Sequence, residues 1–279
     1  SAGHTSGRII SEGEETIQLA IQSRQSSISI QIWKEYTDQI EISIINPSGV
    51  RVGPVPEILG PHRFRIGQTE ILLYYGEPSP YSISQEIYID LLPVESYLTE
   101  GIWRIVLSAG KIVTGQYEMW LPSDNVLNRG TGFLFPTDAT TLTIPSSSSR
   151  AISVGAYDAR TFAYADFSGR GEKINRENRL MFADSKPDLA APGVDLLVPA
   201  SEGSTQRVSG TSFATPLVSG AAALLMEWGI EKGNDPYLYG EKLKAYLRKG
   251  AKKLRGETDY PNERVGYGAL CAAQSLLKI

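Results

Sequence analysis

The sequence predicts an α/β chain in two parts, an all-β sandwich followed by half of a parallel-sheet domain. Two observations support this prediction. Before about Leu142, apolar and polar residues alternate in several runs, which is the pattern of half-buried strands. After Leu142, short apolar runs bounded by Gly or Pro precede a long run of small and apolar residues, the order expected for buried parallel strands and a helix packed on them.

The first part contains six runs with a period of two, at least in part. They cover residues 28–33, 39–44, 64–66, 85–91, 103–107 and 116–121. Turn signals separate them, at 46–49, 76–80 and 108–111. Six to eight strands with no intervening helix predict an antiparallel sandwich over residues 11–141, of the jelly-roll type.

The second part contains two apolar runs, 152–156 and 196–198, that are predicted to be buried parallel strands. A run from Thr211 to Trp228 then predicts a central helix. Gly210 permits a tight turn before this helix, so Ser212 is expected at the helix N-terminus. There its free N–H and the helix dipole favour an oxyanion on a bound carbonyl. The alternative is that Ser212 only caps a buried Ala-rich helix.

The run from Gly210 to Gly220 resembles the serine motif of the subtilisin-like proteases at every fixed place, including Pro216. The resemblance covers about 140 residues, from Leu142 to the C-terminus, and includes 151–156, 165–171, 187–194 and 265–270. It implies that residues 142–279 form the C-terminal half of a subtilisin-like α/β domain. It also implies that Ser212 is the nucleophile, supported by Gly210 and Thr211.

A serine nucleophile needs a base and an orienting group, and the chain holds only His4 and His62. Neither has the family's helix-opening context. His4 precedes a strand-like run, and His62 is expected in an exposed turn. No aspartate or asparagine stands in the family's Asp or oxyanion Asn motif. The resemblance implies that residues 1–10 are a remnant that follows the oxyanion motif, and that the N-terminal segment of the same protease supplies the missing residues.

The resemblance further implies a substrate pocket of which this chain supplies one wall, at Ile144, Pro145 and Ser146. Four consecutive serines from Ser146 also fit a solvated loop. A sandwich between the oxyanion asparagine and the serine is similar to the clostridial spore-germination protease subgroup, some members of which are pseudoproteases. Two functions follow as expectations, an active serine endopeptidase acting on protein or peptide substrates, or a non-catalytic scaffold that binds protein partners.

The sandwich itself suggests a sugar-binding platform, because Trp33, Trp103 and Trp120 lie on its strands. The phase of Trp103 and Trp120 instead predicts core packing. Carboxylates such as Asp90 and Glu95 are scattered, so no metal site is predicted, and no cofactor is expected.

Composition sets the remaining expectations. With 279 residues and 41% hydrophobic residues, the chain can build a sizeable core of one or two domains. A net charge of −4 argues against a nucleic-acid partner, and no run approaches the roughly 18 apolar residues of a membrane span. The single cysteine, Cys271, is expected to be buried and inert. Localisation stays open between a secreted and a spore-associated bacterial protein.

Overall fold

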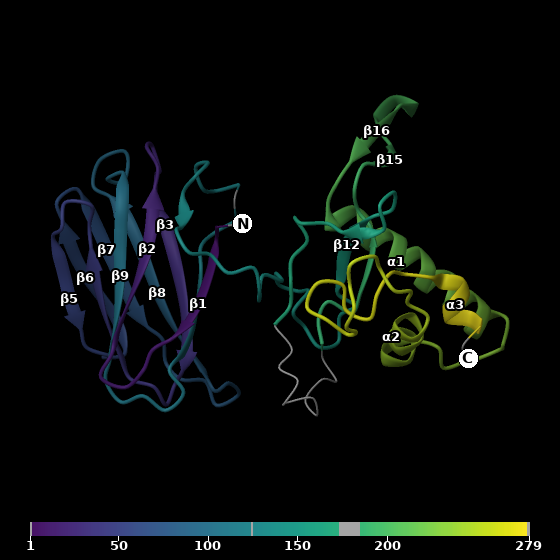
Figure 1. Ribbon diagram of the computed structural model, residues 1–279, viewed down its shortest axis with the longest axis horizontal. Coiled ribbons are helices and arrows are strands. Elements are labelled where there is room, and N and C mark those ends of the chain that lie inside the picture. Colours follow the sequence, from purple (N-terminus) through teal and green to yellow (C-terminus); the bar gives the residue numbers. More distant parts are fainter. Residues whose placement is uncertain (1, 124, 173–184, 278–279) are drawn as a thin grey trace. The chain divides into compact units, whose positions relative to one another are not determined.

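The computed structural model of the chain describes residues 2–123, 125–172 and 185–277. The chain divides into two compact units, Ser1–Asp138 and Ala139–Ile279. Figure 1 shows strands throughout the first unit and a mixture of strands and helices in the second.

The first unit consists of two antiparallel sheets. The six-stranded sheet has the order β1 (His4–Arg8), β10 (Gln116–Trp120), β3 (Ile28–Glu35), β8 (Ser84–Pro93), β7 (Thr69–Tyr75), β6 (Gly60–Ile66). The five-stranded sheet has the order β11 (Gly132–Phe133), β2 (Glu14–Ile21), β9 (Gly101–Ala109), β4 (Ile40–Ile45), β5 (Arg51–Val55). Inward residues of both sheets form one core, and isoleucines predominate in it. The two sheets therefore pack face to face as a sandwich.

Strand pairing changes the expected division of the chain. Residues 1–10 were expected to be a remnant of the second domain, but β1 pairs antiparallel with β10 from His4↔Trp120 to Arg8↔Gln116. The chain leaves the sandwich beside the same strand, because Thr137 N–H donates to His4 O over 2.8 Å. The first and last segments of the sandwich unit are thus bonded to each other.

Two tryptophans of the sandwich, Trp103 and Trp120, differ in whether they lie in the core. Trp103 is 1% exposed and lies in the core, as expected. Trp120 was expected there too, but Tyr117 and Met119 are the inward residues of β10, so Trp120 points to the opposite face. His62 also differs from expectation, since it lies within edge strand β6 rather than in a turn.

The second unit is built on a small sheet with the order β13 (Ala163–Tyr164), β12 (Val154–Asp158), β14 (Leu189–Pro192). Strands β12 and β14 run parallel, in the register Val154↔Leu189 to Tyr157↔Pro192. The helices are α1 (Thr211–Met226), which continues into the π-helical turn η3 (Glu227–Glu231), α2 (Gly240–Lys249) and α3 (Ala272–Leu277). Cys271 lies just before α3 and is half-buried.

The run 196–198 was expected to be a buried parallel strand, and this was wrong. β15 (Leu196–Pro199) pairs only with β16 (Thr205–Val208), antiparallel, and Leu197 is 63% exposed. The turn η2 (Ser201–Gly203) reverses the chain, with Glu202 and Gly203 both at positive φ. This turn converts the apolar run into a hairpin that extends away from α1 and β12 (Figure 1).

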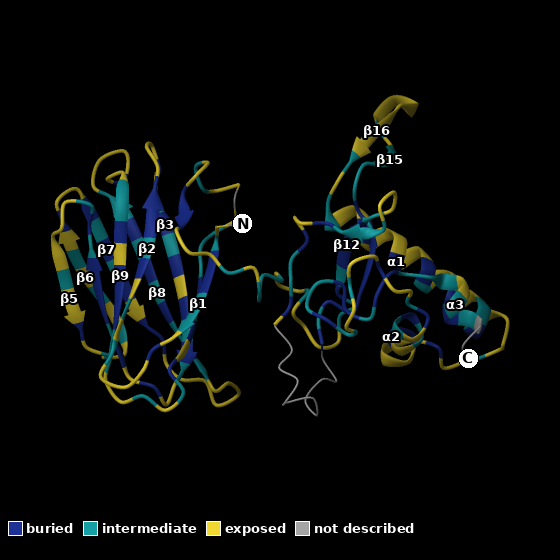
Figure 2. Cartoon of the chain, viewed as in Figure 1, coloured by how far each residue is buried: buried dark blue, intermediate teal, exposed yellow. Residues whose placement is uncertain are grey.

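Helix α1 buries one stripe of residues and exposes much of the rest. Ala214, Val218, Ala221 and Leu225 recur at helical spacing and are buried. The stretch Thr211–Glu231 has the length and mean hydropathy, 1.3, of a membrane span, which the sequence analysis did not expect. In its 18-residue apolar segment, 28% is buried. Core helices of water-soluble proteins share these two properties. Figure 2 shows the exposed and buried positions alternating along the helix.

The Asp38 carboxylate holds the loop between β9 and β10. It is buried and accepts hydrogen bonds from the N–H groups of Val113, Thr114 and Gly115 and from the Thr114 hydroxyl, at 2.5–2.9 Å. Burial alone raises the pKa of this carboxyl, but the hydrogen bonds outweigh burial and hold the pKa below its ordinary value.

We therefore predict that Asp38→Asn lowers the free energy of unfolding of the sandwich by at least about 3 kcal/mol above pH 5. Because the pKa is depressed in the folded state, this contribution is present above the unfolded pKa of about 4 and is lost as pH falls through the folded value. Denaturant unfolding followed by tryptophan fluorescence between pH 3 and 7 measures it, with Asp90→Asn as the control. Equal stability of the two variants at pH 7 would contradict the assignment.

Candidate active site

Ser212 lies where helix α1 meets the parallel strands. The Gly210 N–H donates to Gly193 O over 2.8 Å, and Gly193, just after β14, donates to Tyr157 O at 3.0 Å. The turn before α1 is thereby bonded to the carboxyl ends of β14 and β12. In α/β sheets this end is where ligands bind.

Two glycines allow the close approach at this turn. Gly210 has φ 151°, a conformation that side chains rarely adopt. A Cβ on Gly193 would lie 2.7 Å from the Ala156 Cβ and 3.1 Å from Gly210 O. Ala156 and Ala214 are completely buried between the sheet and the helix, so only small residues separate the helix from the sheet.

The side chain of Ser212 is exposed and makes no hydrogen bond to another described residue. Its N–H belongs to the first turn of α1, where helical N–H groups have no partner within the helix. The Phe213 N–H donates to Gly210 O at 3.1 Å, and the Thr211 carbonyl accepts from the Thr215 hydroxyl at 3.0 Å. The arrangement presents a hydroxyl and a donor together at the positive end of a helix.

Both histidines lie in the first unit, whereas Ser212 lies in the second. His4 is 2% exposed, with Nε2 2.6 Å from Glu118 Oε2 and Nδ1 2.9 Å from the Thr137 hydroxyl. Both ring nitrogens are therefore used within the sandwich. His62 Nε2 lies 2.8 Å from Ile58 O, and its ring is near those of Phe64 and Tyr75. The second unit contains no histidine in its sequence, so an imidazole base for Ser212 must come from outside that unit.

The three residues of the expected pocket wall lie in the loop before β12. Ile144 is 90% exposed, and Ser148 N–H donates to Pro145 O at 2.9 Å. The Ser146 hydroxyl lies 2.5 Å from the Ser153 hydroxyl, which ties this loop to the start of β12. The structure gives no contact between these residues and Ser212.

A buried cluster of charges next to this loop was missed by the sequence analysis. Asp188 is completely buried, and its carboxylate accepts from Ser153 N–H at 2.6 Å, Lys186 Nζ at 2.9 Å and Arg248 Nε at 2.8 Å. Lys244, 2% exposed in its side chain, lies 3.6 Å from the same carboxylate and donates to Ser149 O. The four-residue spacing of Lys244 and Arg248, which places both on one helix face, was the sequence signal that could have predicted this cluster.

A second ionic group lies at the base of the β15–β16 hairpin. The Asp195 carboxylate is 2.9 Å from Arg207 Nη1 and 3.1 Å from Arg160 Nη1. The Asp195 N–H donates to the Ser209 hydroxyl at 2.9 Å, three residues before Ser212. These bonds hold the hairpin against the turn that leads into α1, although the exposed pairs contribute little to stability individually.

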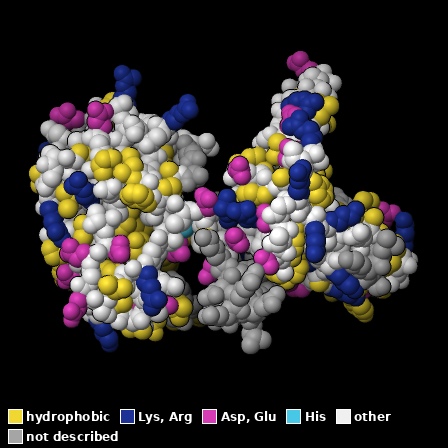
Figure 3. Space-filling model, in the orientation of Figure 1, with side chains coloured by type: hydrophobic (Ala, Val, Ile, Leu, Met, Phe, Trp, Pro, Cys, Tyr) yellow, Lys and Arg dark blue, Asp and Glu magenta, His cyan; other side chains and the backbone are white. Residues whose placement is uncertain are grey.

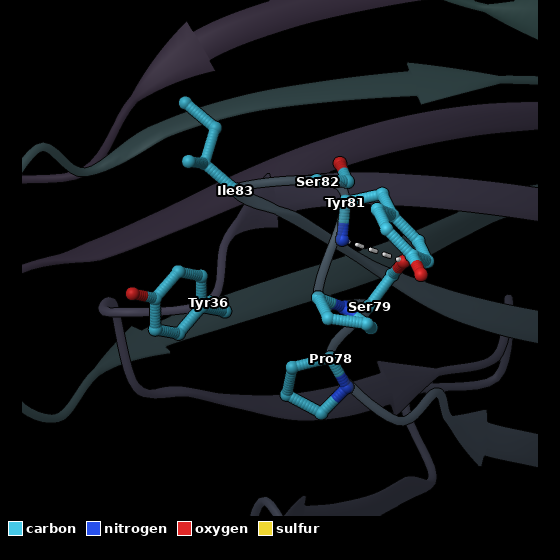
Figure 4. Close-up of a pocket in the computed structure, with 7 residues that line it drawn as sticks. Tyr36, Pro78, Ser79, Tyr81, Ser82 and Ile83 are labelled. Atoms are coloured by element: carbon cyan, nitrogen blue, oxygen red, sulfur yellow. Dashed lines mark hydrogen bonds between the residues drawn. The ribbon is translucent and has the colours of Figure 1, made fainter.

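One hollow on the sandwich lacks the groups of a catalytic site. A hollow of about 590 Å³ lies on the sandwich, lined by Tyr36 and the loop from Pro78 to Ile83 (Figure 4). Its titratable side chains are tyrosines, so it lacks a nucleophile with a base. Within residues 2–123, 125–172 and 185–277, no three His, Cys, Asp or Glu gather as metal ligands.

Comparison with known proteins places these features in context. A profile of the subtilase family (Peptidase_S8) matches residues 104–268, more than half of the chain. The serine protease AprX of Bacillus subtilis (strain 168) is 32% identical over 159 residues, covering 50% of this chain and 32% of that protein. Proteinase R of Parengyodontium album is 40% identical over 77 residues, covering 26% and 20% respectively.

The solved structure of the Clostridium perfringens CspB protease matches with a TM-score of 0.89 and 36% sequence identity. The match covers 99% of this chain and 56% of that protein. The chain thus spans about a third or less of the length of these curated relatives and little more than half of the matched structure.

We predict that Asp188→Asn destabilises the second unit by about 3–5 kcal/mol, because it leaves Arg248 and Lys244 buried without their carboxylate. Amide hydrogen exchange of peptides covering β12 and α2 measures the effect locally. Asp166→Asn, at an exposed aspartate, is the control. Unchanged protection in both peptides would show that the cluster does not stabilise this unit.

Proposed function

Because the chain belongs to the subtilase family of serine proteases, we propose that Ser212 is the nucleophile of a serine endopeptidase. One observation carries the proposal. The exposed Ser212 hydroxyl and its N–H stand together at the start of α1, beside the carboxyl ends of two parallel strands. Gly210 and Thr211 would support the serine by fixing the turn that precedes it.

The proposed reaction is acyl transfer from a peptide bond to Ser212. The Ser212 oxygen attacks the peptide carbonyl carbon, and its proton passes to a histidine base. The Ser212 N–H stabilises the oxyanion of the tetrahedral intermediate, together with an asparagine amide. The base then protonates the leaving amine, and water hydrolyses the acyl-enzyme. Substrates are accordingly proteins or peptides.

We place the histidine, its orienting aspartate and the oxyanion asparagine on the N-terminal segment of the same protease, outside residues 1–279. His4 and His62 are already bonded within the sandwich, which supports this assignment. On this proposal residues 1–279 alone hydrolyse nothing. The single observation that favours the alternative, a non-catalytic scaffold for protein partners, is that the unit that carries Ser212 contains no histidine.

The exposed side of α1 supports a covering segment. Phe213, Leu217 and Leu224 are 37%, 43% and 61% exposed, and Met226 is 37% exposed. A helix that is apolar on all sides belongs inside a protein. Figure 3 shows hydrophobic side chains among the charged ones on the surface of this unit. We propose that the N-terminal segment packs on this side of α1 and brings the base to Ser212.

The remaining assignments concern the organisation of the chain. We propose that residues 142–279 are the C-terminal half of the catalytic domain, with Ile144, Pro145 and Ser146 as one wall of its substrate pocket. The sandwich is proposed to be a jelly-roll insert of the catalytic domain. Strand orders β1-β10-β3-β8 and β2-β9-β4-β5 support this interpretation, with the β6–β7 hairpin and β11 as additions.

We predict that Ser212→Ala in the complete protease abolishes labelling by a fluorophosphonate probe and lowers peptidase activity by at least about three orders of magnitude. Intact mass and peptide mapping locate the label. Ser219→Ala, on an exposed position of the same helix, should label normally. Residues 1–279 alone should remain unlabelled, and labelling at Ser212 only after addition of the N-terminal segment supports the two-segment site. No labelling in the complete protein would favour the scaffold.

We also predict that Leu217→Asp or Leu224→Asp lowers co-purification of the co-expressed N-terminal segment at least tenfold. A charge on a surface that must become buried opposes association. Leu197→Asp, at a comparably exposed leucine of the β15 strand, is the control and should leave co-purification unchanged. Full co-purification with both α1 variants would contradict the proposed contact.

A further inference from the structure

The outward face of the six-stranded sheet carries aromatic and acidic side chains in register. Trp33 on β3 lies directly opposite Glu118 on β10 and opposite Glu86 on β8. Gln31, two residues earlier, lies opposite Tyr88. We call this surface the acidic–aromatic face, defined by Gln31, Trp33, Glu35, Glu86, Tyr88, Asp90 and Glu118.

The alternation of β3 and β8 fixes which residues form this face. Ile28, Ile30 and Ile32 point into the core, so Gln31 and Trp33 must point outward. On β8, Ile87, Ile89 and Leu91 occupy the core in the same way. Trp33, Glu86 and Tyr88 are half-buried, which means that their neighbours hold them and leave part of each accessible.

Charge on the β10, β3 and β8 part of the outward sheet face has one sign, whereas Arg8 on β1 and Arg63 and Arg65 on β6 lie on the two outer strands. The outward positions of β3, β8 and β10 include four carboxylates and no Lys or Arg. Glu118 pairs with His4, and Glu86 Oε1 accepts from Gln31 Nε2 at 3.1 Å. Within the described residues, no Lys or Arg forms an ion pair with any of these four carboxylates. The whole unit is also acidic, with nine Lys and Arg against sixteen Asp and Glu in residues 1–138.

A tryptophan between two carboxylates fits a cation better than a neutral ligand. Directly opposed side chains on neighbouring strands lie about 5 Å apart, so one group over the Trp33 ring is within reach of both glutamates. A guanidinium stacks on an indole and donates to carboxylates with the same planar group. A sugar also stacks on aromatic rings, but it gains nothing from the flanking charges.

We propose that the acidic–aromatic face binds a basic polypeptide segment, with an arginine side chain seated on Trp33 between Glu86 and Glu118. The occupant follows from charge complementarity, because the face and its unit are acidic. The proposal is independent of the catalytic function of Ser212. It gives the sandwich a role in protein recognition that needs no catalytic residue.

The test uses residues 1–279 and a short labelled peptide with two arginines separated by one glycine, measured by fluorescence anisotropy at low salt. Trp33→Leu and Glu86→Gln should each weaken binding about fivefold to tenfold. Tyr81→Leu and Glu77→Gln replace the same kinds of residue on an exposed loop of the same unit and should change it less than twofold. Binding should also weaken as salt is raised.

Probe chemistry separates the possible occupants. A peptide with citrulline, the neutral isostere of arginine, should bind at least tenfold more weakly, and a lysine peptide should bind between the two. Equal affinity of the citrulline peptide, or binding of cellohexaose that Trp33→Leu removes, would overturn the proposal. The proposal would also be overturned if Glu77→Gln weakened binding of the arginine peptide as much as Glu86→Gln does. Absence of any binding of the arginine peptide would overturn it as well.

Discussion

The close seating of α1 on the parallel pair β12 and β14 is the constraint on which the candidate site depends. Ala156 and Ala214 leave no room for a larger side chain between sheet and helix, and a Cβ on Gly193 would collide with Ala156. This contact lets the Gly210 N–H reach Gly193 O. The start of α1, and with it Ser212, is thereby fixed relative to the carboxyl ends of both strands. The small residues at this contact therefore fix where α1 lies against the sheet, and their effect on helix propensity is secondary.

Two buried carboxylates fix loops that hydrophobic packing does not hold. Asp38 accepts hydrogen bonds from three backbone N–H groups at Val113–Gly115 in the sandwich, and Asp188 accepts one from Ser153 in the second unit. These donors have no strand partners, and in the sandwich the single Asp38 carboxylate satisfies three of them. Around Asp188 the arrangement also neutralises cations of α2. The loop before β12 is therefore fixed from both its Ser149 and Ser153 ends.

Local patterns predicted six strands of the sandwich, β3, β4, β6, β8, β9 and β10, and the helix that begins at Thr211, because period and turn chemistry lie within a few residues. They did not predict β1, β2, β5, β7 or β11. They failed where a partner or a turn outside the run decides the outcome. Residues 1–10 join β10 only because strand pairing brings them there, and 196–198 turn outward because of Glu202 and Gly203. Trp120 was misplaced because its neighbours Tyr117 and Met119 take the inward positions. Two partners of Asp188, Ser153 and Arg248, lie 35 and 60 residues away in sequence, beyond any local pattern.

The proposed division of the active site between two segments ties catalysis to folding. A base acts on Ser212 only within hydrogen-bond distance of its hydroxyl, so the segment that carries the base must be held against α1. The exposed apolar residues of α1 suit that purpose, since burying each large one stabilises the association by about 1.5–3 kcal/mol. The same side chains that complete the fold would then align the reacting groups. On this proposal, the N-terminal segment both buries the apolar surface of α1 and supplies the base that lets Ser212 react. The Ser212 N–H then stabilises the oxyanion only once that segment is bound.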